Sequence, residues 1–196
     1  MTHFIGIDDE KFIRGNIPMT KCEVRILALA KAKIKSTDVV LDIGAGTGSL
    51  SVEAALLAPE GKVFAVEREA EGVSLIRANC DKFGVSNIAV IEGNAPDVLV
   101  NIPLCDVVFV GGSGGKLEEI IEAANNLLKI GGRMIITAVT VETLYKALQT
   151  VQAKDNFTVE AFGVQVSRIR KVASYNMLQA INPINIISCL KGGQHG

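Results

Sequence analysis

Residues 39–48, with the sequence VVLDIGAGTG, constrain the fold more than any other stretch of this chain. The apolar run 39–43 predicts a strand that is buried on both faces. Residues 49–58 then carry apolar side chains at helical spacing, which predicts a helix. Strand, turn and helix in this order indicate a βαβ nucleotide site, in which the helix directs free N–H groups at the ligand. The turn between strand and helix consists of Gly44, Ala45, Gly46, Thr47 and Gly48.

The spacing of the three glycines distinguishes two classes of cofactor. A dinucleotide site has the pattern G-x-G-x-x-G, with the pyrophosphate on the helix N-terminus. Here the pattern is G-x-G-x-G, and Asp42 stands two residues before the first glycine. This pattern resembles motif I of the S-adenosylmethionine-dependent methyltransferases, whose ligand has no pyrophosphate. A glycine-rich turn without a ligand is the alternative, but three glycines in five residues favour a binding loop.

Two further points predict contacts with a nucleoside. Residues 62–67, KVFAVE, form a second short apolar strand that ends on Glu67, nineteen residues after Gly48. An acidic residue at the end of this strand can accept hydrogen bonds from both ribose hydroxyls. Asn94, at the end of the third predicted strand, can pair with the edge of an adenine. Taken singly, Glu67 could be a solvated carboxylate and Asn94 part of a plain turn.

The composition limits the class of protein. The chain has 196 residues, 48% of them hydrophobic, and a net charge of −1, which predicts a single soluble α/β domain with no nucleic-acid partner. No apolar run approaches the length of a membrane span, about 18 residues, and no leader is visible, so we expect a cytoplasmic protein with no membrane partner. Four dispersed cysteines and two terminal histidines, His3 and His195, predict no protein-bound metal.

The order of the predicted elements favours a doubly wound fold. After a lead-in and a helix in residues 1–35, strands and helices alternate through residues 36–155, which hold the cofactor site. Thr20 and Glu23 have the spacing of a capping box, so we expect this first helix to begin at Thr20. Residues 156–196 change to two successive strands, 157–172 and 182–190, with Gly163 as a bulge. We therefore predict a mostly parallel, seven-stranded sheet with a C-terminal antiparallel hairpin, an order typical of class I methyltransferases rather than NAD-binding domains.

Three segments resemble a narrower family. They are the sequence PMTK at residues 18–21 followed by EVR at 23–25, the sequence VGGSGG at 110–115, and Asn182-Pro183 before the last strand. With them the chain resembles the cobalt-precorrin carbon-15 methyltransferases (decarboxylating) of cobalamin biosynthesis, and equally the C-terminal half of the fused precorrin-6Y methylase.

The resemblance implies methyl transfer from S-adenosylmethionine to carbon 15 of a tetrapyrrole, coupled to decarboxylation of an acetate side chain. It implies cofactor contacts by Thr20, the loop 44–48, Glu67 and Ala95. The family usually has Asp where this chain has Asn94. It also implies a homotetramer, whereas the sequence leaves open whether a carbon-5 precorrin methylase is a further partner.

The acceptor site is predicted from charge. A tetrapyrrole carries several carboxylates, which arginine binds best through its planar fork. We expect this clamp from Lys21 and Arg25 on the first helix, and from Arg168 and Arg170 on the hairpin. The loop that contains Gly112 and Ser113 is the next candidate, and no residue is assigned to catalysis.

Three other functions remain open from the sequence. They are a class I methyltransferase with another small-molecule or protein acceptor, a NAD-binding oxidoreductase, and a non-catalytic S-adenosylmethionine-binding assembly subunit.

Overall fold

The computed structural model describes residues 5–192, so the ends of the predicted segments 1–35 and 156–196, with His3 and His195, lie outside the described residues. Strands and helices alternate from residue 39 to residue 152, as predicted. The elements are η1 (Asp9–Lys11), α1 (Cys22–Ala32), β1 (Val39–Ile43), α2 (Ser49–Leu57), β2 (Lys62–Glu67), α3 (Ala70–Phe83), β3 (Ile88–Glu92), η2 (Asp97–Asn101), β4 (Cys105–Val110), α4 (Leu117–Leu127), β5 (Leu128–Ala138), α5 (Val141–Gln152), β6 (Phe157–Val164), β7 (Ser167–Val172), β8 (Tyr175–Ala180) and β9 (Ile184–Lys191).

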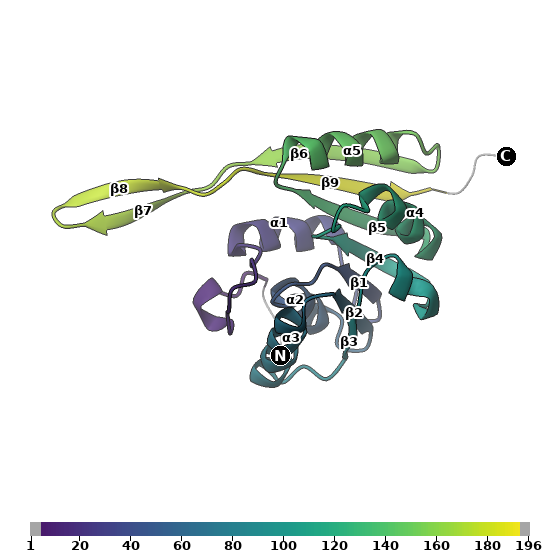
Figure 1. The fold of residues 1–196 in the computed structure, drawn as a ribbon, viewed down its shortest axis with the longest axis horizontal. Helices are drawn as coiled ribbons and strands as arrows, with labels where there is room; N and C mark the ends of the chain where they lie inside the picture. Colours follow the sequence, from purple (N-terminus) through teal and green to yellow (C-terminus); the bar gives the residue numbers. More distant parts are fainter. Residues whose placement is uncertain (1–4, 193–196) are drawn as a thin grey trace.

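A seven-stranded sheet forms the centre of the molecule, in the order β3-β2-β1-β4-β5-β9-β6 (Figure 1). The pairs from β3 to β5 are parallel, and β9 is antiparallel to both of its neighbours. This confirms the predicted doubly wound, mostly parallel sheet. The chain proceeds outward from β1 to β3 on one side and from β4 to β5 on the other. The strand order therefore reverses between β1 and β4, where ligands bind in open α/β sheets.

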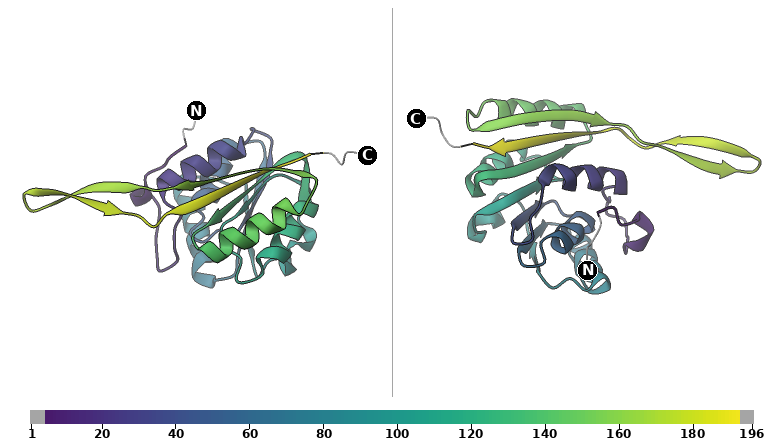
Figure 2. Two further views of the ribbon diagram at one scale, coloured as in Figure 1. Left: turned by 90° about the horizontal axis from the view of Figure 1, so that it is seen from above. Right: turned by 180° about the vertical axis from the view of Figure 1, so that it is seen from behind.

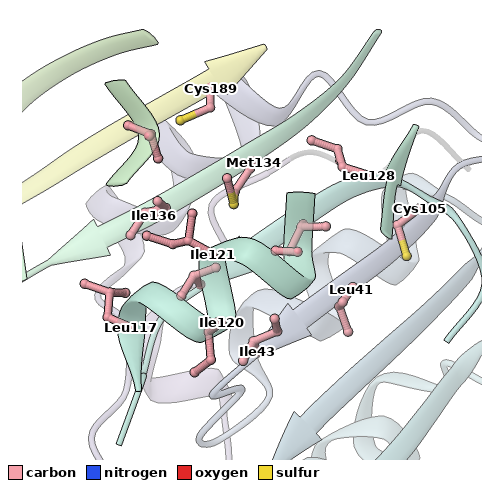
Figure 3. Close-up of a cluster of buried hydrophobic side chains, with 14 of the residues drawn as sticks. Leu41, Ile43, Cys105, Leu117, Ile120, Ile121, Leu128, Met134, Ile136 and Cys189 are labelled. Atoms are coloured by element: carbon pink, nitrogen blue, oxygen red, sulfur yellow. The ribbon is translucent and has the colours of Figure 1, made fainter. Parts of the chain in front are cut away.

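Helices cover both faces of the sheet. Alternate side chains of β1 pack on opposite faces of the sheet. Val40 packs with α1 and α2, whereas Leu41 and Ile43 pack with α4. Figure 3 shows the second of these clusters, in which Ile120 and Ile121 of α4 lie on the strands. Both clusters are fully buried at their centres, which accounts for the near-continuous apolar sequences of the central strands.

The C-terminal strands depart from the prediction in one respect. Residues 157–172 are two strands, and Gly163 is not a bulge, because it pairs in regular register with Asn185. β6 and β9 belong to the main sheet, whereas β7 and β8 continue beyond it as a separate two-stranded sheet. This pair, residues 167–180, projects from the body as an arm (Figure 2). Every residue of β8 is exposed.

The first helix also begins differently from the prediction. α1 starts at Cys22 with Lys21 as N-cap, and no capping bond comes from Thr20. The Asp9 carboxylate accepts the backbone N–H of Cys22 at 2.9 Å instead. A carboxylate from the preceding segment thus satisfies a donor that the capping box was expected to satisfy. Among the described residues, no helix has the length and apolar character needed to cross a bilayer.

Candidate functional site

A cavity of about 360 Å³ lies at the carboxyl ends of β1, β2 and β4, at the predicted point of strand reversal. The glycine loop after β1 forms its floor, the end of β2 one wall, and the loop after β4 another. Its lining includes Ile17, Pro18, Gly44, Gly46, Glu67, Arg68, Glu69, Asn94, Ala95, Gly112, Ser113 and Lys116.

The N–H groups of the glycine loop are mostly used inside the protein. Those of Gly44 and Ala45 donate to the carbonyl of Val66 at 2.9 and 3.0 Å, and that of Gly48 donates to the carbonyl of Ala45. The N–H of Gly46 donates to the Glu67 carboxylate at 2.8 Å. No residue of α2 lines the cavity. The expectation that free N–H groups of this helix face the ligand therefore stays a prediction, and the four bonded N–H groups of the loop are not available to a pyrophosphate.

Two glycines in the loop permit close approaches of the backbone. A Cβ at Gly44 would lie 2.6 Å from the nitrogen of Gly112, and one at Gly46 would lie 3.1 Å from the carbonyl oxygen of Pro18. Both residues also have positive φ, 75° and 57°. Only glycine allows this conformation without strain, and only glycine lets the loops after β1 and β4 touch.

Glu67 is the anchored carboxylate of the cavity. Its side chain is 7% exposed, and its oxygens accept the N–H groups of Gly46, Arg68 and Glu69 at 2.8 to 2.9 Å. These bonds fix the carboxylate at the cavity wall. Oε1 accepts two of the N–H groups, whereas Oε2 accepts one and retains capacity for a further donor. The geometry therefore leaves room for a contact between Oε2 and a ribose hydroxyl.

Asp42 adds a second carboxylate beneath the loop. It is buried and accepts the hydroxyl of Ser51 at 2.5 Å. Burial raises the pKa of Asp42 to about 6, and the charge of Glu67 adds to this increase, although the Ser51 bond opposes it. Two carboxylates beside one loop disfavour a phosphate and favour a cationic ligand.

The predicted cofactor residues separate into two groups. Five of them line the cavity, namely Gly44, Gly46, Glu67, Asn94 and Ala95, and so do Gly112 and Ser113, which were predicted to contact the acceptor. Thr20, Ala45, Thr47 and Gly48 are not among the lining residues, although three of them belong to the loop. Within the described residues, the Oγ1 of Thr47 is the buried side-chain polar atom that has no hydrogen-bond partner.

Sequence reasoning missed several lining residues. Ile17 directly precedes the PMTK segment and Pro18 is its first residue, Arg68 follows Glu67, and Lys116 follows the loop 111–115. Their proximity to predicted motifs was the available signal.

A second cavity of about 110 Å³ lies beyond the loop after β4, which lines both cavities. Among residues 5–192, no group of three His, Cys, Asp or Glu side chains is placed to hold a metal ion.

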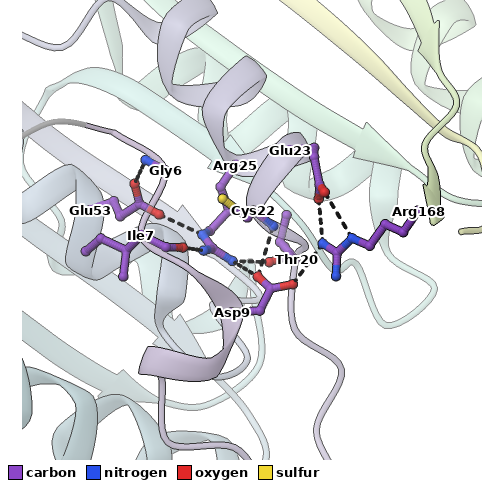
Figure 4. A network of polar contacts seen from close by, with 9 residues as sticks. All are labelled: Gly6, Ile7, Asp9, Thr20, Cys22, Glu23, Arg25, Glu53 and Arg168. Atoms are coloured by element: carbon purple, nitrogen blue, oxygen red, sulfur yellow. Dashed lines mark hydrogen bonds and ion pairs between the residues drawn. The ribbon is translucent and has the colours of Figure 1, made fainter. Parts of the chain in front are cut away.

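Arg25 does not belong to an acceptor clamp, which corrects the prediction. Its side chain is 0% exposed and lies in the polar network of Figure 4. Nε donates to Glu53 at 2.7 Å, and one terminal nitrogen donates to Asp9 at 2.8 Å. The other donates to the carbonyl of Ile7. Burial alone would raise the pKa of Asp9, but the hydrogen bond and charge of Arg25 outweigh it and lower that pKa.

The hairpin arginines differ from each other. Arg168 makes a two-bond ion pair with Glu23, at 2.7 and 3.0 Å, and reaches Asp9 at 3.3 Å. Its hydrogen bond is the main cause of the lowered pKa of Glu23. Arg168 is thus engaged within the chain and lines neither cavity, so it is not placed as a substrate clamp. Arg170 is exposed on the arm, and Lys21 is half-buried; neither lines a cavity.

Comparisons with known proteins agree on one family. A family model described as "Precorrin methyltransferase domain" matches residues 11–191. A probable cobalt-precorrin-6B C(15)-methyltransferase (decarboxylating) of Saccharolobus solfataricus is 42% identical over 187 residues, covering 93% of this chain and 94% of the relative. The cobalt-precorrin-6B C(15)-methyltransferase (decarboxylating) of Salmonella typhimurium is 37% identical over 188 residues, 95% and 97% of the two chains. The crystal structure of precorrin-6y C5,15-methyltransferase from Geobacter metallireducens matches with a TM-score of 0.90 and 41% identity, covering 95% and 97%.

The contact between the two loops predicts a cost for Gly44→Ala. The new Cβ would meet backbone of Gly112 and would occupy a positive φ, so we expect a loss of about 2–5 kcal/mol in the free energy of unfolding. Gly84→Ala is the matched control, because Gly84 has φ of 65° and open space around its Cβ. Gly84→Ala should lower the free energy of unfolding by about 1–2 kcal/mol, which is the cost of the positive φ alone. Urea denaturation of both variants gives the values, and equal losses would contradict the close approach.

Burial of Asp42 predicts a pH dependence of stability. Because its pKa is higher in the folded than in the unfolded chain, the folded state binds the proton more tightly. The contribution of Asp42 to the free energy of unfolding therefore falls as the pH rises from about 4, near the pKa in the unfolded chain, through the folded pKa of about 6. Asp42→Asn should remove this fall, so its stability relative to wild type should rise by about 1–2 kcal/mol between pH 5 and pH 7.5. Urea denaturation at several pH values measures this, and a constant difference would show that Asp42 has an ordinary pKa.

Proposed function

The chain belongs to the precorrin methyltransferase family, and on this basis we propose that it methylates carbon 15 of a cobalt-precorrin or precorrin and decarboxylates an acetate side chain, which loses its carboxyl group as carbon dioxide. This reaction places it in cobalamin biosynthesis. The family match supports the resemblance seen in the sequence. The observation that carries the proposal within the structure is the cavity at the strand reversal, with Glu67 fixed in its wall.

S-adenosylmethionine, when bound, supplies a methyl group on a positively charged sulfur. The residues present fit such a ligand. Glu67 would accept a ribose hydroxyl through Oε2, Asn94 and Ala95 would border the adenine, and the loop containing Gly44 and Gly46 would hold the amino-acid end. Asp42 and Glu67 give the site a negative potential that favours a cation. NAD fits poorly, because the N–H groups that would hold its pyrophosphate are already bonded.

The acceptor has to lie outside the cavity. A volume of about 360 Å³ is near the lower limit for a drug-sized ligand, so the cofactor fills it and a tetrapyrrole must cover its opening. Arg68 and Lys116 both line the cavity, on the loops after β2 and β4. Within residues 5–192 each forms an ion pair with an exposed carboxylate, Arg68 with Glu69 at 3.0 Å and Lys116 with Asp97 at 3.2 Å, and such surface pairs are weak.

We therefore place the carboxylate clamp at these two cations, with Lys21 and Arg170 retained as further candidates. The walls would then hold the ring carbon in line with the methyl donor, and such placement supplies much of the rate. When the carbon–carbon bond to the carboxylate breaks, the electron pair stays on the side-chain carbon, where the conjugated ring can take it up.

The test is a turnover assay paired with a binding measurement. Wild-type protein should convert cobalt-precorrin-6B and S-adenosylmethionine into a product that has gained one methyl group and lost carbon dioxide, detected by mass spectrometry. Glu67→Gln keeps the shape but places an amide donor against backbone N–H groups, so S-adenosylhomocysteine should bind about 10–100-fold more weakly in calorimetry.

Other outcomes identify the alternatives. Binding of S-adenosylhomocysteine without turnover would indicate an assembly subunit, and methylation of a different acceptor would indicate another methyltransferase. Binding of NAD in place of S-adenosylhomocysteine would refute the proposal.

The arm supports the proposed homotetramer. Ile169 and Leu178 face each other across β7 and β8 and are 72% and 74% exposed. A two-stranded hairpin with apolar side chains in water is marginally stable alone, and such surfaces mark interfaces. We propose that other copies of this chain cover it. The cytoplasmic location, expected from the sequence pattern, stays a prediction, and association with a carbon-5 methylase stays an open question.

The interface predicts that a charge on the arm dissociates the oligomer. Leu178→Asp should lower the molecular mass in sedimentation experiments, because burying an unpaired carboxylate in an apolar contact is unfavourable. Gln179→Asp, one residue further on the opposite face of β8, introduces the same charge as a control and should leave the mass unchanged. A monomeric wild type, or an unchanged mass in Leu178→Asp, would contradict this role of the arm.

A further inference from the structure

The segment that precedes α1 forms part of the cofactor cavity. Residues 5–21, here called the strap, contain only the short η1 as regular structure. Even so, Ile17 and Pro18 line the cavity, and the carbonyl of Pro18 lies 3.1 Å from the position of a Cβ on Gly46. The strap thus forms a wall directly over the glycine loop. A segment with so few backbone–backbone hydrogen bonds of its own must be held in place by side chains.

Arg25 is the side chain that holds the strap at both ends. Its guanidinium donates to the carbonyl of Ile7 near the beginning of the strap and to the carbonyl of Thr20, at 2.5 Å, near its end. It also binds Asp9 in between, while Nε fixes the whole group to Glu53 of α2. The guanidinium fork therefore joins three points of the strap to the body (Figure 4).

Two further contacts secure the strap near its middle and its beginning. The buried side-chain amide of Asn79, on α3, exchanges hydrogen bonds with the N–H and carbonyl of Ile13, at 2.8 and 3.1 Å, and also donates to the carbonyl of Thr47 at 2.9 Å. Near the beginning, Glu53 accepts the N–H of Gly6 at 2.6 Å. The strap is thereby connected to the glycine loop itself.

We propose that Arg25 is a positioning residue for the cofactor site, which sets Ile17 and Pro18 against the glycine loop without touching the ligand. The inference rests on the proposed function only in taking the cavity as the S-adenosylmethionine site. Thr20 fits this role as well, because Arg25 holds its carbonyl two residues after Pro18.

Arg168 provides an internal comparison. It reaches Asp9 from the outside at 3.3 Å and binds Glu23, but it makes no bond to the strap backbone. Its loss leaves the bonds from Arg25 to Ile7, Asp9 and Thr20 intact. Arg168→Gln should therefore change the cofactor site much less than a change at Arg25.

The experiment measures affinity and strap mobility together, in the full chain. Arg25→Lys keeps the charge but lacks the fork, so we expect S-adenosylhomocysteine to bind about 10-fold more weakly in calorimetry. Trypsin should also cut after the exposed strap residues Lys11 and Arg14 about 10-fold faster, as followed by mass spectrometry. Asp9→Asn is a second variant that keeps the shape of the network, and it should shift both quantities in the same direction. Arg25→Gln should shift them further than Arg25→Lys, so that lysine gives partial rescue.

A matched control separates positioning from general destabilisation. Val151→Ala removes buried apolar atoms from α5, on the other face of the sheet, and should lower overall stability without moving the strap. It and Arg168→Gln should keep the affinity and the cleavage rate within about twofold of wild type.

Three results would overturn the inference. If Arg25→Lys and Asp9→Asn lose stability but keep the affinity, Arg25 is only structural. If Val151→Ala weakens binding equally, the effect is not specific to the strap. A wild type that does not bind S-adenosylhomocysteine would refute this inference and the proposed function together, whereas retained affinity in the variants refutes this inference alone.

Discussion

The structure depends on one buried cation. Arg25 is fully removed from water, and a guanidinium in that position must be completely paired, because an uncompensated buried charge costs about 3–5 kcal/mol. Its partners come from the segment before α1 and from α2, and Arg168 extends the same cluster to the root of the arm. Pairing this one charge therefore fixes the relative positions of three parts of the chain, namely α1, α2 and the segment before α1.

The proposed cofactor site is also preorganised, because its polar groups are hydrogen-bonded within the protein before any ligand binds. Glu67 accepts three backbone N–H groups, and the loops after β1 and β4 touch through Gly44 and Gly112. A preformed cavity lowers the cost of ordering on binding. It also explains why few reactive side chains are needed, because a methyl transfer between well-placed partners depends mainly on geometry.

The sequence was sufficient where local pattern decides the structure. The strand and loop at residues 39–48, the mostly parallel seven-stranded sheet and the position of Glu67 at the end of a strand were confirmed, because apolar runs, glycines and strand ends have direct structural meaning. Arg25 was misassigned, because its partners Asp9 and Glu53 stand 16 and 28 residues away and their pairing is purely tertiary. The sequence pattern did not predict that the strand 157–172 is divided after Val164. Apolar and polar residues alternate on both sides of this point, and only the burial of the side chains changes.

Amide hydrogen exchange of the free protein tests the central claim, that side-chain anchors hold the strap over the glycine loop before ligand binds. The N–H groups of Gly6, Ile13 and Cys22 donate to Glu53, Asn79 and Asp9, respectively. The account predicts that these amides are protected nearly as well as that of Leu29 in the buried face of α1. Exchange of the strap amides at the rate of an unstructured chain, while Leu29 remains protected, would contradict it.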